Sequence, residues 1–186
     1  MKLPEVRLNP VRVAEAVPSI LFLLLWRTGQ DAQMTGWIGC GLAALLIVGF
    51  LVLRQRFHPI MLGINIHLLL AAPLITAAFE LQGPDAGNFL IRYAETGVLV
   101  MVFLTGLGLT IFSKGGFLGE PEVPWHINWR FSLLMLICAA GSLPLSIQLQ
   151  DRIAFLAVAG PLILLFILRN YLAGLAQRTG GGKPDS

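Results

Sequence analysis

Apolar residues form long, nearly continuous runs along this chain, and short clusters of charged and polar residues separate them. Several runs approach the roughly 20 residues that an α-helix needs to cross a hydrocarbon core. Because the runs are continuous rather than alternating, and because backbone groups in lipid must be satisfied within each span, the pattern favours helices over a β-barrel. Six spans are predicted, at Val13–Trp26, Thr35–Leu53, Pro59–Phe79, Asn88–Phe112, Phe131–Leu149 and Ile153–Leu172.

The first predicted span is the shortest. Its apolar part covers about 20 Å at 1.5 Å per residue, so it must thin the bilayer, extend its flanking side chains to the interface or fail to cross. If the amino terminus is inside, ten Lys and Arg residues fall on inner segments and three, Arg27, Arg92 and Arg152, on outer ones. Cytoplasmic loops carry the excess of cations in membrane proteins, so we predict that both termini are cytoplasmic.

Composition agrees with this interpretation. Hydrophobic residues make up 56% of the 186 residues and charged residues 12%, whereas a soluble domain is about 25% charged. The predicted fold is an all-α polytopic membrane bundle in one domain, 1–186. Its parts are a cytoplasmic amino-terminal segment, 1–12, a cytoplasmic surface loop, 114–130, and a flexible tail, 178–186.

Two charged residues at the head of the fourth predicted span, Arg92 and Glu95, are three positions apart and can pair on a helix. The same R-x-A-E pattern opens the first span at Arg12 to Glu15. A second match follows in each half, because "AAPLI" at 71–75 is similar to "AGPLI" at 159–163. Copies separated by an odd number of spans are inverted, so the pattern allows a 3+3 inverted repeat with helix breaks at Pro73 and Pro161, a device of transporters. Alternatively, the two prolines only kink their helices, and neighbouring helices or hydroxyls satisfy the freed carbonyls.

Asn65 and His67 are polar residues inside the third predicted span. Polar groups in a span avoid lipid, so both are expected to face the bundle. They either form interhelical hydrogen bonds or, with Arg92 and Glu95, line a polar path or bind a ligand.

A segment rich in aromatic residues precedes the fifth predicted span and contains Trp125, His126 and Trp129. Tryptophan is enriched at membrane–water interfaces, and two prolines oppose a regular helix before Trp125. We predict a segment at the cytoplasmic surface that contacts partners.

Signatures of catalysis are missing: the sequence has no H-E-x-x-H, G-x-S-x-G or P-loop motif. His67 and His126 are expected at different depths, which argues against a haem with two histidine ligands. The spacing of His58, Glu120, Glu122 and His126 matches no metal-binding motif. We therefore predict no enzyme, no cofactor and no metal.

Two stretches, "PSILFLLLWRTGQDAQ" at 18–33 and "PEVPWHINWRFSLLML" at 121–136, resemble bacterial intracellular septation protein A and its small multi-span relatives. The resemblance implies an inner-membrane protein linked to envelope integrity or division that acts by association. It implies no catalytic residue.

Three functions remain open at this point. The first is a non-enzymatic membrane protein that works through lipid, protein or homo-oligomeric partners in the cell envelope, without nucleic acid. The second is a small transporter or channel with a polar path near Asn65 and His67. The third is a membrane subunit of a larger complex.

Overall fold

The computed structural model describes residues 10–28 and 31–180. Most of the predicted amino-terminal segment and residues 181–186 of the predicted tail lie outside the described residues, whereas Arg178 and Thr179 belong to the last helix.

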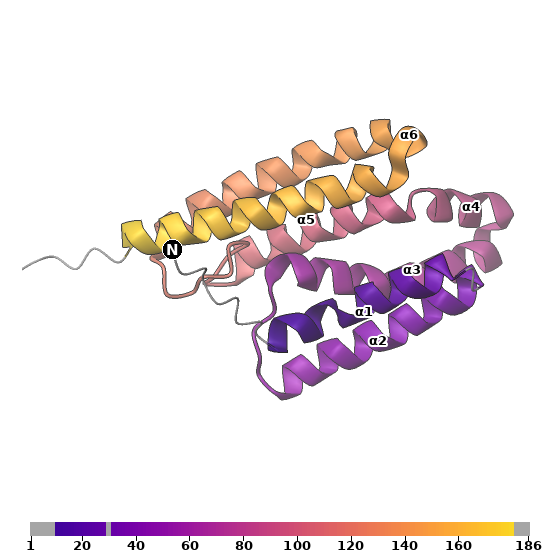
Figure 1. The fold of residues 1–186 in the computed structure, drawn as a ribbon, viewed down its shortest axis with the longest axis horizontal. Helices are drawn as coiled ribbons and strands as arrows, with labels where there is room; N and C mark the ends of the chain where they lie inside the picture. The colour runs from indigo at the N-terminus through magenta and orange to yellow at the C-terminus, as the bar shows by residue number, and fades with distance from the viewer. Residues whose placement is uncertain (1–9, 29–30, 181–186) are drawn as a thin grey trace, which may run out of the picture.

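The described residues form six helices and no strand. They are α1 (Pro10–Arg27), α2 (Ala32–Val52), α3 (Pro59–Gln82), α4 (Pro84–Arg92), α5 (Ala94–Phe112) and α6 (Trp125–Gly180). Helix α6 contains two apolar segments, Trp125–Leu149 and Leu156–Thr179, and bends back on itself between them (Figure 1). These two segments of α6, together with α2, α3 and α5, are the five described segments that are long and apolar enough to cross a membrane. Helix α1 contributes a shorter apolar stretch, Val13–Leu25. The chain is an all-α membrane helix bundle.

The fourth predicted span is wrong as a single helix. The chain from 84 to 112 forms two helices, α4 and α5, with a break at Tyr93, where φ is −99° and ψ is 9°. Helix α4 is only 9 residues long and amphipathic, and Gly83 with a φ of 90° begins the turn that leads into it. The apolar run therefore describes α5 alone, whose 19 residues extend about 28 Å and match the thickness of a hydrocarbon core.

Helices α1, α2 and α3 lie together as one group, and α5 and the two segments of α6 form the other (Figure 1). The groups meet where α3 packs against α5. A Cβ at Gly63 would lie 2.6 Å from Val102 Cα, so glycine permits this close approach. Small residues allow the van der Waals contact that holds membrane helices together.

Two opposite ends of the bundle can be distinguished (Figure 1). One, here called the α4 end, carries α4, the α1–α2 turn and the bend of α6. The other, the loop end, carries the α2–α3 connection, the loop of residues 113–124 between α5 and α6, and the last turn of α6. Helix α1 begins at the loop end, and α6 both begins and ends there.

The sequence suggested that the loop before α6 lies on the surface. In the structure, residues 113–124 lie only partly on the surface. Phe117 and Leu118 are completely buried and belong to the hydrophobic core. Asn128, in the first turn of α6, donates from Nδ2 to the carbonyls of Lys114 at 3.0 Å and Glu120 at 2.8 Å. The loop is thus folded into the bundle, because its apolar side chains complete the core while side-chain amides satisfy its backbone.

Pro73 and Pro161 lie inside helices that continue on both sides of them, so at these positions the chain follows the alternative of a kink and not of a helix break. Proline leaves the carbonyl four residues earlier without its helical partner, and for Pro73 that carbonyl belongs to Leu69. The thiol of Cys40 on α2 donates to this oxygen at 3.2 Å. A neighbouring helix therefore replaces the missing hydrogen bond, and the helix continues.

Substitution of Cys40 tests this replacement. Cys40→Ala should lower the free energy of unfolding in detergent by about 0.6 kcal/mol, the average for interhelical hydrogen bonds in membranes. Cys40→Ser should retain stability, since a hydroxyl can donate to the same oxygen. Scanning fluorimetry of both variants provides the measurement, and equal losses would show that shape, not the hydrogen bond, matters at this position.

The inverted repeat stays a prediction. Of the matched glutamates, Glu15 is buried and Glu95 is exposed, so the two copies place the same residue type in different surroundings.

Candidate functional site

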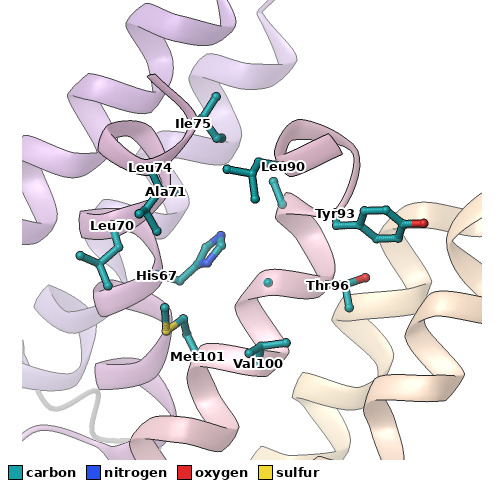
Figure 2. A pocket seen from close by; sticks show the side chains of 12 residues that line it. His67, Leu70, Ala71, Leu74, Ile75, Leu90, Tyr93, Thr96, Val100 and Met101 are labelled. Atoms are coloured by element: carbon teal, nitrogen blue, oxygen red, sulfur yellow. The ribbon is translucent and has the colours of Figure 1, made fainter. Parts of the chain in front are cut away.

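An apolar groove lies between α3 and α5 and is closed at one end by Leu90 of α4 (Figure 2). Its volume is about 250 Å³, near the lower limit of pockets that take small molecules. Nearly all of its wall is hydrocarbon. It is lined by His67, Leu70, Ala71, Leu74, Ile75, Leu90, Tyr93, Ala94, Thr96, Gly97, Val100 and Met101.

The groove opens sideways between membrane-crossing helices. Leu70, Leu74 and Val100 line it and are also exposed on the surface of the bundle. The lining residues of α3 extend from His67 to Ile75, a distance of about 12 Å along the helix. Its opening therefore faces the region that lipid chains occupy.

His67 is the one titratable side chain with its polar end in the groove. Its ring points from α3 toward α5 (Figure 2), where a Cβ at Gly97 would lie 2.9 Å from Cε1. The absence of a side chain at Gly97 provides the space for the imidazole. The phenol of Tyr93 points away toward α6 (Figure 2), and the Thr96 hydroxyl lies 3.2 Å from Ser146 Oγ, which leaves the remaining wall apolar.

Asn65 does not share this site. It is completely buried, and its Nδ2 donates to the backbone carbonyls of Glu15 at 3.1 Å and Met61 at 2.9 Å. Its amide therefore ties α3 to α1, whereas His67, two positions later, faces α5. The structure does not bring the two predicted polar-path residues together.

Arg92 and Glu95 are also separated. Arg92 ends α4 and Glu95 lies in the first turn of α5, so the break at Tyr93 removes the helical spacing on which their predicted ion pair depended. The guanidinium of Arg92 lies 5.8 Å from the centre of the Tyr93 ring, and Glu95 is exposed. The predicted ion pair does not form between these two described residues.

Three charged residues at the loop end form buried contacts that sequence analysis did not find. Glu15 is 2% exposed, and its Oε1 accepts from the backbone N–H of His58 at 3.1 Å, at the start of α3. Arg169 is 7% exposed and donates from Nε to Leu118 O and from Nη2 to Glu120 Oε1, both at 2.9 Å. The sequence did contain a signal, because Arg169 lies within the sixth predicted span, Ile153–Leu172. In the structure α6 continues for about three turns after Arg169, so this cation lies inside a helix rather than in a terminal segment.

The predicted partner residues begin α6. Trp125 and Trp129 are 64% and 40% exposed, and their ring centres lie 6.1 Å apart. His126 between them is also exposed. This aromatic pair lies at the rim of the loop end, and its contact with the membrane interface or with partners stays a prediction.

Among the side chains that the structure describes, no three His, Cys, Asp or Glu residues gather closely enough to hold a metal ion. Comparison with protein-family models, with curated proteins and with solved structures finds no match for this chain.

Proposed function

We propose that this chain is a non-enzymatic protein of the bacterial inner membrane, with both termini in the cytoplasm, that supports envelope integrity or division by binding lipid and protein partners. The observation that carries this proposal is the groove beside His67. Its wall is apolar and it opens sideways toward lipid, so it suits the hydrocarbon part of a membrane molecule and not a hydrated solute. The resemblance of residues 18–33 and 121–136 to septation protein A adds the link to the envelope.

The separation of Asn65 and His67 argues against the transporter alternative. A polar path needs polar groups that face one cavity, whereas the amide of Asn65 is used between α3 and α1. The subunit alternative keeps some support, because many large apolar side chains are exposed on α2, such as Leu45 at 73% and Val52 at 75%. Lipid covers such faces equally well.

Filling the groove tests the proposal. In host cells that lack the protein, the native chain should restore resistance to detergent and normal cell length. Ala71→Phe, which places a ring in the groove, should reduce this rescue at unchanged expression. Leu45→Phe adds similar bulk on the exposed face of α2 and should rescue fully.

Two results would contradict the proposal. One is full rescue by Ala71→Phe, which would remove the groove from the function. The other is a solute flux in protein-containing vesicles that Glu95→Gln or His67→Phe abolishes, which would favour the transporter.

A further inference from the structure

Charge is divided unequally between the two ends of the bundle. Among the described side chains, the exposed ions of the loop end are five cations and one acid: Arg54, Arg56, Lys114, Arg130, Arg178 and Glu122. Counted over the described side chains in the same way, the α4 end has the opposite balance, with one exposed cation and four exposed acids: Arg92, Asp31, Glu80, Asp85 and Glu95. We call the five loop-end cations the cationic rim.

Among the described side chains, no acid neutralises the cationic rim. Of the two less exposed acids at this end, Glu15 accepts from the backbone N–H of His58, and Glu120 forms an ion pair with Arg169 at 2.9 Å. Glu120 is the one that a surface cation could approach, because its side chain is 22% exposed. The second carboxylate oxygen of Glu120 accepts from Gln177 Nε2 at 3.2 Å. Within the described part of the chain, none of the five rim cations forms an ion pair with an acid. Their charge is available to a partner outside the chain.

Two features place the rim at the depth of lipid headgroups. The exposed pair Trp125 and Trp129 precedes Arg130 directly, and tryptophan rings settle at the headgroup level. Phe112, which is 88% exposed, comes two residues before Lys114. Exposed aromatic side chains are thus close in sequence to two of the rim cations. This combination suits a membrane surface better than a nucleic acid.

The folded loop holds part of this surface in place. Asn128 binds the carbonyl of Lys114 from the first turn of α6, and the Ser132 hydroxyl accepts from the N–H of Leu118 at 3.3 Å. Lys114 and Arg130 are therefore fixed to the same rigid unit, so little conformational freedom is lost when both contact headgroups.

From this arrangement we propose that the cationic rim binds anionic phospholipid headgroups and enriches them around the loop end. The proposal rests on the proposed function and names the class of its lipid partner. Each cation near an anionic surface contributes about 1 kcal/mol, equivalent to a factor of about five in the local preference for anionic over neutral lipid.

Lipid retention in nanodiscs tests the proposal. The full chain is placed in a mixture of phosphatidylglycerol and phosphatidylcholine, and the retained lipids are counted by native mass spectrometry after mild detergent extraction. Phosphatidylglycerol should be enriched over the bulk ratio. Lys114→Gln with Arg130→Gln should reduce the enrichment by about fivefold for each cation at low salt, and added salt should reduce it further.

Two matched variants act as controls. Glu122→Gln removes the exposed acid of the loop end and should increase the enrichment, whereas Arg92→Gln at the α4 end should leave it unchanged. Bulk lipid ratios around the native protein, or equal effects of Arg92→Gln and the rim variants, would overturn the proposal. If neutral lipid is retained without preference, only the headgroup proposal fails; if neither lipid nor protein partners are retained, the proposed function fails as well.

Discussion

Glu120→Ala should destabilise the protein more than any other single loss of a polar group at the loop end. The substitution removes the carboxylate that contacts the guanidinium of Arg169 at 2.9 Å, where the Arg169 side chain is only 8% exposed. Removing one member of a buried ion pair costs about 3–5 kcal/mol, and we expect about 3 kcal/mol because Glu120 itself is 22% exposed. Thermal unfolding in detergent, followed by tryptophan fluorescence, measures the loss.

Two further variants show whether loss of the buried ion pair is the cause. Glu122→Ala, an exposed acid two positions away, should change stability little. Adding Arg169→Met to Glu120→Ala should recover part of the loss, because the buried guanidinium that had contacted the carboxylate is then absent as well. If the double variant is less stable than Glu120→Ala alone, the hydrogen bond from Arg169 Nε to Leu118 O matters more than the ion pair.

Gly63→Ala should force α3 and α5 apart. The added Cβ would lie 2.6 Å from the backbone of Val102, which cannot move aside as a flexible side chain can. Overpacking of this kind costs about 1–3 kcal/mol, and Gly63→Val should cost more. The same unfolding measurement in detergent applies.

Gly41→Ala is the matched control, since a Cβ at Gly41 would meet nothing within 4 Å. Alanine is the better helix former by about 1 kcal/mol, so this variant should be as stable as the native chain or slightly more so. Equal effects of the two substitutions would mean that helix propensity, and not the α3–α5 contact, decides stability.

The membrane class and most helix positions could be predicted from the sequence, because the length of an apolar run determines whether a helix can cross a bilayer. The five long apolar segments correspond to predicted spans. The division at Tyr93 could not be predicted, since neither proline nor glycine occurs between Gly87 and Gly97 to mark it. A neighbouring group that satisfies the carbonyl freed by Pro73 could be expected from the sequence, but not that it is the thiol of Cys40 on α2, 29 positions away from Leu69.

The candidate site shows the same limit. Asn65 and His67 were recognised as polar residues in a span, but the sequence could not say that one faces α1 and the other α5. Nor could it show that Gly97 leaves space for the imidazole, or that Arg169 and Glu120, 49 positions apart, meet inside the loop end. Hydropathy along the chain determined what lies in the membrane, since transfer from water to lipid depends on each segment's own composition. The packing of helices against one another decided which polar groups are used internally and which apolar surface stays open, because those contacts join residues far apart in the chain.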